Sequence, residues 1–250
     1  MIKFSRIAAK IVSLILNEIK KEIKPGLSGK DLEKISVLIM KKNKAKSSSL
    51  GYGGFPSSIC VSINDELTHG VPDDRKFKLG DLVSVDVACK YKGFHADAAF
   101  TFLIEDYSQD LNPEYNQKRM LIDVTKSALS FAINSIVPGK TTTRDLGNVI
   151  QSYVESRNYF VIKEYGGHGI GRLLHMDPFI PNYKIDHDED VISPGMLICI
   201  EPLVQIGDDK IKISPNGKTI ISSNGFLNAH FEHTILINEN SVEVLTDVDD

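Results

Sequence analysis

The chain is poor in residues that mark several classes of protein. Its 250 residues include no tryptophan and only three cysteines, Cys60, Cys89 and Cys199. None of the three forms a C-x-x-C pair, which argues against a disulfide framework and against a structural zinc knuckle. This cysteine usage is typical of the reducing cytosol, so we predict a cytoplasmic protein.

A basic excess and a long apolar run are also missing. The formal net charge is −4, which argues against specific binding to nucleic acid or to an anionic membrane. The lysine-rich stretch within Lys41–Ser49 has no interleaved aromatic residues, and we interpret it as a solvated loop. No apolar run approaches the ~20 residues of a membrane-spanning helix, so we predict no membrane association.

The N-terminal segment resembles a secretory signal only loosely. Ile11 to Leu16 is apolar and follows basic residues, but no small-residue cleavage site comes after it. The apolar residues of this region, such as Ile7 and Ile19, recur at helical spacing. That spacing predicts an amphipathic helix packed on the protein.

The chain does contain an internal repeat. Ile23–Gly26 and Ile136–Gly139 each follow a helical pattern and end in Pro-Gly, and Gly80–Asp86 matches Gly195–Glu201. The two offsets are 113 and 115 residues. The period is too long for a solenoid and predicts one duplication. A chance match is the alternative, because Pro-Gly after a helix is common.

The repeat predicts how the chain is organised. With 42% hydrophobic residues, it can form one domain over residues 1–250 from duplicated halves of about 1–110 and 111–250. Each half is expected to run helix, turn, helix and then strands. We therefore predict an α/β (α+β) fold with a curved, mainly antiparallel sheet backed by helices. If the halves pack about a pseudo-twofold axis, Asp86 and Glu201 face each other across it.

Five polar residues interrupt or flank apolar, strand-like runs. A buried carboxylate is costly unless it is paired, protonated or bound to a metal ion. Each residue alone has a structural explanation, such as a solvent-facing strand or a surface histidine, but their combination is more specific. The five residues are Asp86, Asp97, His168, Glu201 and Glu232.

Their spacing and chemistry indicate a metal site. Gly93 between the two aspartates suits a hairpin turn, which would bring Asp86 and Asp97 onto neighbouring strands. Four carboxylates and one imidazole suit Mn, Fe(II) or Co at least as well as Zn. One small cation cannot use all five ligands, whereas two ions about 3.5–4 Å apart can. A site of this kind activates water for hydrolysis.

These residues, in this order, resemble the type I methionine aminopeptidases, which have the pita-bread fold. The similarity extends from Ser5 to Leu245. The resemblance implies metal-dependent removal of the N-terminal methionine from nascent polypeptides. The strings that carry it are Gly51–Pro56, Asn64–Pro72, Gly80–Asp86, Gly167–Gly171, Pro194–Met196, Ile200–Pro202 and Phe231–Thr234.

The resemblance also implies a role for each metal ligand. Asp97 and Glu232 would bridge two divalent ions. Asp86 would chelate one ion, and His168 together with Glu201 would bind the other. Glu201 is also implied as the group that accepts the proton of the attacking water.

The same resemblance implies the substrate contacts. His175 would stabilise the tetrahedral intermediate at the scissile carbonyl oxygen. His69 would hydrogen-bond near the scissile nitrogen and help the amine to leave. Tyr52, Phe55 and Cys60 would line an apolar pocket for the methionine side chain. A monomer, and transient contact with the ribosome, fit this substrate class.

Several positions depart from the family pattern. Lys218 stands where the family usually has Trp, and Leu174 where Phe is common. Met176 replaces a Glu that usually follows the second histidine, and His230 replaces a common Gln. The ligands are kept while the pocket is changed, so strict methionine selection is predicted less firmly than aminopeptidase chemistry. The alternatives are an Xaa-Pro peptidase, which usually carries an extra N-terminal domain, and a non-catalytic peptide-binding protein, which usually loses metal ligands.

Overall fold

The computed structural model describes residues 2–105, 113–186 and 190–248, and structural statements concern these residues. No helix in this part of the chain combines the length and apolar character required to cross a membrane. The helices are α1 (Ile2–Glu22), α2 (Gly29–Lys42), the short 3₁₀ helix η1 (Tyr52–Gly54), α3 (Pro113–Asn134) and α4 (Thr143–Glu155).

The strands are distributed over both predicted halves. Those before α3 are β1 (Lys46–Ser47), β2 (Cys60–Ile63), β3 (Glu66–Thr68), β4 (Leu82–Tyr91) and β5 (Phe94–Leu103). Those after α4 are β6 (Phe160–Val161), β7 (Gly166–Gly169), β8 (Met176–Pro181), β9 (Leu197–Ile200), β10 (Leu203–Gln205), β11 (Ile211–Ile213), β12 (Ile220–Ser222), β13 (Asn228–His230), β14 (Glu232–Ile237) and β15 (Val242–Val244).

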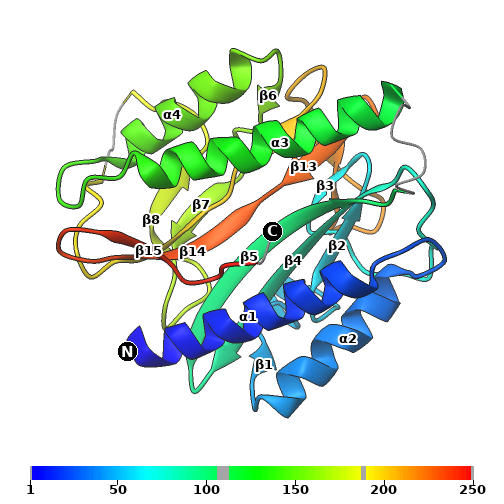
Figure 1. Cartoon of the computed structure of the whole chain (residues 1–250), viewed down its shortest axis with the longest axis horizontal. Helices are drawn as coiled ribbons and strands as arrows, with labels where there is room; N and C mark the ends of the chain where they lie inside the picture. Colours follow the sequence, from blue (N-terminus) through cyan, green and yellow to red (C-terminus); the bar gives the residue numbers. More distant parts are fainter. Residues whose placement is uncertain (1, 106–112, 187–189, 249–250) are drawn as a thin grey trace.

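One large antiparallel sheet organises the protein. Its order is β1-β4-β5-β14-β9-β7-β8, with β2 also paired to β4 and β15 to β14. Two small sheets, β13-β10-β6 and β11-β12-β3, hold the remaining strands. Figure 1 shows the helices on one face of the large sheet: α1 lies over β4 and β5 with α2 beside it, and α3 and α4 lie over the strands of the second half. The predicted antiparallel sheet backed by helices is confirmed.

The amphipathic helix α1 packs on the hairpin of β4 and β5, as predicted. Ile15 of the helix is fully buried, and so are Val83, Val85 and Val87 of β4. Burying an aliphatic side chain of this size contributes about 1.5–3 kcal/mol. Because side chains alternate along a strand, Asp86 between these valines points to the opposite face of the sheet.

The hairpin itself has the predicted turn. Lys92 and Gly93 connect β4 to β5, and their φ angles are 49° and 84°. Two consecutive positive φ angles are typical of a two-residue hairpin turn whose twist matches that of the strands. This turn sets Tyr91 opposite Phe94 and thereby determines the register of the whole hairpin.

Corresponding turns recur in the two halves. Gly26 and Gly139 both have positive φ angles, 88° and 75°, which glycine adopts without strain. The Gly26 N–H donates to the carbonyl of Phe77 (2.9 Å), and the Gly139 N–H donates to that of Ile192 (2.8 Å). The helices that follow, α2 and α4, both begin with a capping box. The division of the chain near residue 110 stays a prediction.

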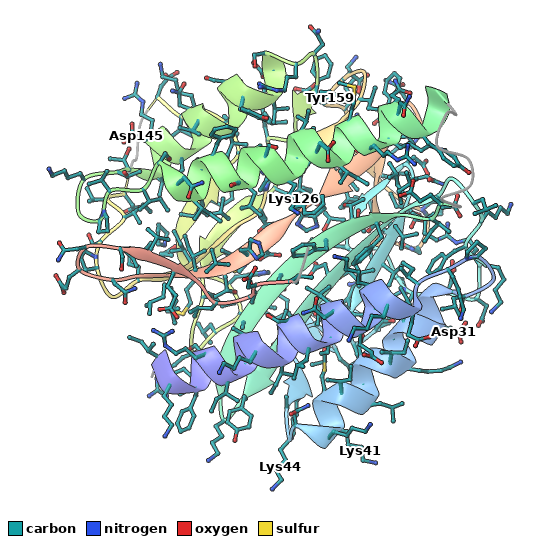
Figure 2. All side chains as sticks on the ribbon, viewed as in Figure 1. Asp31, Lys41, Lys44, Lys126, Asp145 and Tyr159 are labelled. Atoms are coloured by element: carbon teal, nitrogen blue, oxygen red, sulfur yellow. The ribbon has the colours of Figure 1, made fainter. Side chains whose placement is uncertain are left out.

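The loop interpretation of Lys41–Ser49 is only partly correct. Helix α2 continues through Lys42, and β1 pairs with β4 through Lys46 opposite Lys90. A two-residue strand is too short to show a pattern of its own and exists because β4 offers it a partner. Lys41 and Lys44 are exposed and project outward beside the end of α2 (Figure 2), as a solvated segment should.

A substitution at Gly147 tests how closely α4 packs against the residues that follow β8. A Cβ built at this position would lie 2.1 Å from the carbonyl oxygen of Tyr183. Gly147→Ala should therefore lower the free energy of unfolding by about 1–3 kcal/mol, although alanine is the better helix former. Urea unfolding measures this change. Asn148→Ala, at the exposed next position, is the control and should not destabilise; an equally stable Gly147→Ala protein would contradict the packing.

Candidate metal centre and active site

The five predicted metal ligands lie together in one cleft of about 800 Å³. They come from strands that are consecutive neighbours in the large sheet, in the order β4-β5-β14-β9-β7. Each strand brings one ligand to the face opposite the helices, within the strand or directly after it. In strand order, the predicted ligands are Asp86, Asp97, Glu232, Glu201 and His168.

Strand register sets the spacing of three carboxylates. Asp86 pairs with Ala99 of β5, and Ala99 pairs with Glu232 of β14. Asp97 lies two residues from Ala99 and therefore on the same face. The small Ala99 side chain leaves space between the acidic groups. The Thr234 hydroxyl accepts from the Asp97 N–H (2.9 Å) and donates to the Asp97 carbonyl (2.7 Å), which fastens β14 to β5 here.

Burial makes these carboxyl groups difficult to ionise. The exposed fraction is 2% for Glu232 and 6% for Asp97. Burial, and then the charge of neighbouring carboxylates, raises the pKa values of Asp97, Glu201 and Glu232 well above the ordinary range. Among the described residues, Asp97 Oδ1 and Glu232 Oε1 have no hydrogen-bond partner. Desolvated acidic oxygens without a partner fit a bound divalent cation.

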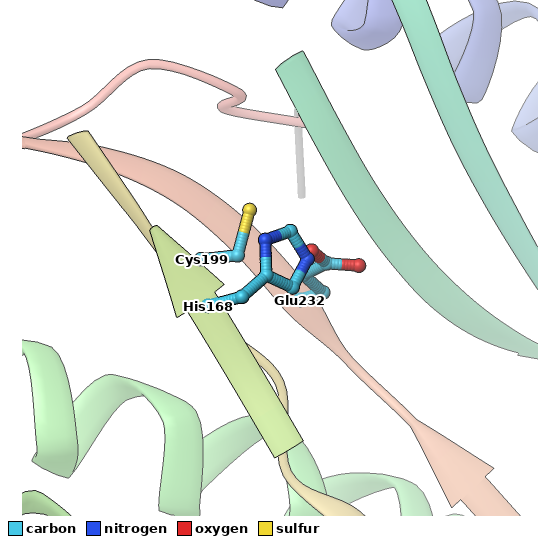
Figure 3. A group of neighbouring side chains, drawn as sticks. All are labelled: His168, Cys199 and Glu232. Atoms are coloured by element: carbon cyan, nitrogen blue, oxygen red, sulfur yellow. The ribbon is translucent and has the colours of Figure 1, made fainter. Parts of the chain in front are cut away.

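Glu232 is common to three overlapping groups of ligand atoms. Within each group, the atoms lie within 4.8 Å of one another. A carboxylate that belongs to every group is suited to bridge two ions. The groups are Asp86–Asp97–Glu232, Glu201–His230–Glu232 and His168–Cys199–Glu232, the last of which is drawn in Figure 3.

His168 presents one ring nitrogen to this cluster. Its Nδ1 lies 2.9 Å from the carbonyl oxygen of Gly169, which can only accept, so Nδ1 carries the proton. Its Nε2 then has a free lone pair and lies 3.8 Å from Glu201 Oε1. Burial, followed by nearby His175, lowers the pKa of His168 to about 4. A neutral ring with a free nitrogen is the form of histidine that binds a metal ion.

His69 and His175 line the same cleft, as predicted. The His69 ring lies edge-on to Tyr165 with 5.6 Å between ring centroids. The His175 ring contacts the His168 ring at 4.3 Å, and its Nδ1 lies 2.9 Å from the Tyr52 hydroxyl. Burial lowers the pKa values of both His69 and His175. This shift favours the neutral imidazole, which can donate one hydrogen bond.

A smaller pocket of about 230 Å³ shares His69, Asp86, Asp97 and His175 with this cleft. Leu174 and Lys218, two of the departures from the family pattern, also line it. Lys218 Nζ donates to the carbonyl of Gly53 (2.8 Å), which joins the turn between β11 and β12 to η1. All residues predicted to contact substrate line this pocket: Tyr52, Phe55, Cys60, His69 and His175.

Two buried residues of the cluster are absent from the ligands predicted from sequence. Cys199 is fully buried and lies two strand positions before Glu201, a spacing that could have identified it. His230 lies two residues before Glu232, and its Nε2 is 3.5 Å from Glu201 Oε2. Strand β13 ends at His230, so alternation along a single strand cannot reveal where its ring points.

Comparisons with known proteins agree with this geometry. The model of metallopeptidase family M24 matches residues 3–239. A methionine aminopeptidase of Mycoplasma capricolum is 44% identical over 96% of this chain and 93% of its own length. Methionine aminopeptidase 1 of Bacillus subtilis is 40% identical over 97% of this chain and 95% of its own length.

Solved structures show the same likeness. The crystal structure of methionine aminopeptidase from Thermotoga maritima aligns with a TM-score of 0.92 at 40% identity, over 98% of this chain and 96% of that one. A prolidase from Pyrococcus furiosus aligns with a TM-score of 0.76 at 22% identity. This chain covers 64% of the prolidase, and that likeness concerns the fold alone.

The curved antiparallel sheet, with helices on one face and an acidic cleft on the other, defines a metallopeptidase of the pita-bread fold. The chain belongs to metallopeptidase family M24, in its type I methionine aminopeptidase branch. It is an enzyme that removes N-terminal methionine by hydrolysis. The fold, enzyme class and activity predicted from the sequence are confirmed.

The raised carboxyl pKa values predict how stability depends on pH once metal is removed by a chelator. The unfolded-state pKa of Asp97 is about 4, and the folded-state pKa is higher. Its contribution therefore favours folding below pH ~4 and is lost as pH rises through the folded-state pKa. His168, whose pKa is lowered, contributes in the opposite direction, because its protonation on acidification opposes folding.

Asp97→Asn separates the two contributions, since asparagine does not ionise and His168 is unchanged. The free energy of unfolding of the wild type, minus that of the variant, should fall as pH rises from about 4 to about 8. Urea unfolding in EDTA at several pH values measures the difference. A difference that is constant or that grows with pH would contradict the raised pKa.

Proposed function

We propose that the cleft holds two divalent metal ions through the five predicted ligands. In this arrangement Asp97 and Glu232 bridge both ions, Asp86 chelates one, and His168 with Glu201 binds the other. The convergence of five neighbouring strands supports it, as do two buried carboxylate oxygens that lack a partner among the described residues. The ligand chemistry favours Mn, Fe(II) or Co, and zinc is also compatible.

The bound ions would polarise the scissile carbonyl and lower the pKa of the attacking water. The chain's own groups handle the protons and the substrate. Glu201, which lines the cleft, accepts the proton of the water. The Nε2–H of His175 donates to the scissile carbonyl oxygen as negative charge develops there. His69 donates a hydrogen bond near the scissile nitrogen and assists departure of the amine.

The proposed substrate is the N-terminal methionine of a new polypeptide whose second residue is small. Tyr52, Phe55 and Cys60 provide apolar surface for the methionine side chain in the pocket of about 230 Å³. The hydrogen bond between Lys218 and Gly53 closes the rim of this pocket. The adjoining cleft of about 800 Å³ is large enough for the residues that follow.

The cellular setting belongs to the same proposal. We expect one domain of two duplicated halves, about 1–110 and 111–250, that acts as a monomer in the cytoplasm. The three free, buried cysteines fit a reducing compartment. Transient contact with the ribosome would deliver the substrate class, and the net charge of −4 argues against specific nucleic-acid binding.

Peptide hydrolysis tests the proposed centre. Protein freed of metal should release methionine from Met-Ala-Ser only after Mn(II) or Co(II) is added, as measured by chromatography. Asp97→Ala should abolish release, because it removes a ligand shared by both ions. Asp123→Ala, at an exposed position of α3, is the control and should keep the wild-type rate. A wild-type rate for folded Asp97→Ala protein would overturn the assignment.

The proposed role of His175 depends on its tautomer. If the Tyr52 hydroxyl donates to Nδ1, the ring proton is on Nε2, where it can reach the substrate. Tyr52→Phe should lower kcat/KM for Met-Ala-Ser about 2–10-fold, as expected for the loss of one hydrogen bond. Tyr153→Phe, on α4, should have no effect. Equal kcat/KM for the wild type and Tyr52→Phe would show that the hydroxyl does not orient His175.

A further inference from the structure

His230 is a buried imidazole for which the proposed mechanism has no role. Its exposed fraction is 2%. The Thr101 hydroxyl accepts from the His230 N–H (2.9 Å) and donates to the His230 carbonyl (2.9 Å), so the backbone is held on both sides. Within the described residues, His230 Nε2 has no hydrogen-bond partner. Burying a polar nitrogen without a hydrogen-bond partner costs free energy. This cost indicates that a bound ligand, rather than a protein group, satisfies the nitrogen.

The unpartnered nitrogen points at the cluster of metal ligands. It lies 3.5 Å from Glu201 Oε2, while His168 Nε2 lies 3.8 Å from Glu201 Oε1. Two imidazoles therefore flank the two oxygens of one carboxylate. Ligands that share an ion through bonds of about 2.1 Å lie about 3–3.5 Å apart. The ligand atoms of Glu201, His230 and Glu232 also lie within 4.8 Å of one another, as donors to one ion should.

We propose that His230 is a sixth protein ligand, binding through Nε2 the ion that Glu201 and Glu232 hold. This inference rests on the proposed two-ion function and extends its ligand set. His230 would add a second imidazole nitrogen, after that of His168, to the carboxylate oxygens around that ion. Imidazole suits Fe(II), Co(II) and Zn(II) better than Mn(II), so this half of the centre should favour those metals.

Calorimetric titration of metal-free protein with Co(II) tests the proposal directly. The wild type should bind two ions. His230→Gln should weaken one binding step about 10–100-fold, and His230→Ala at least as much, because neither side chain offers an imidazole nitrogen. Wild-type dissociation constants in both variants would overturn the proposal. Weak binding in His230→Ala with full affinity in His230→Gln would also overturn it, because it would show a hydrogen bond to Glu201 rather than ligation.

His95 provides a matched control. It is buried and precedes Asp97 by two residues, as His230 precedes Glu232, but its Nδ1 lies 2.9 Å from the Ser48 hydroxyl oxygen. His95→Gln should keep both Co(II) dissociation constants. If it weakens binding as much as His230→Gln does, loss of a buried histidine disturbs the centre without ligation, and the proposal fails.

A measurement on the unaltered protein covers the case in which the His230 variants do not fold. The chain has seven histidines, and ¹⁵N labelling of their rings reports metal binding by NMR. Addition of two equivalents of Zn(II) should move two ring nitrogens to the metal-bound position, those of His168 and His230. A single metal-bound ring nitrogen would overturn the proposal.

If the proposed two-ion function is wrong, the same measurements give a different result. Wild-type protein that binds fewer than two Co(II) ions would contradict the two-ion function, as would Glu232→Ala protein that binds like the wild type. Two bound ions with only one metal-bound imidazole would leave that function intact and exclude His230 alone.

Discussion

The main constraint on this structure is the free-energy cost of gathering carboxylates on one face of a sheet, where they lose hydration and repel one another. Asp97, Glu201 and Glu232 are close enough that burial and shared negative charge raise all three pKa values. Such a cluster persists when protons or cations neutralise it. The helix-covered face, where α1 packs on β4 and β5, supplies the apolar burial that holds these strands against the repulsion.

Two matching sequence motifs each bring an acidic group to the same cleft. Gly80 and Gly195, with φ angles of 87° and 90°, form the turns before β4 and β9. Asp86 lies six residues after the first glycine, and Glu201 six residues after the second. The charge of Asp86 contributes to the raised pKa of Glu201, so the two side chains interact electrostatically. A similar local motif, present twice in the sequence, thus places two of the predicted ligands in one cleft.

Local features could be predicted because their causes are local. The periodicity of α1 and the hairpin turn at Lys92–Gly93 depend on residues adjacent in the chain, and both elements form as expected. Strand β1 could not be predicted, because two residues become a strand only when β4 lies beside them. The sequence singled out five candidate ligands that the structure brings into one cleft, whereas the geometry of their side chains depends on contacts between strands far apart in the sequence.

The sequence by itself determined the chemistry: an oxygen-rich set of candidate ligands, carried on a hairpin and on strands with matching motifs, that indicates a metal-dependent peptidase. Only the tertiary structure decided which further side chains, such as that of His230, lie beside the predicted ligands. His230 lies opposite Leu203 through the pairing of β13 with β10, two residues beyond Glu201 on the facing strand. No local pattern encodes that approach, because it arises from strand pairing between segments 27 residues apart and from the burial that the pairing imposes.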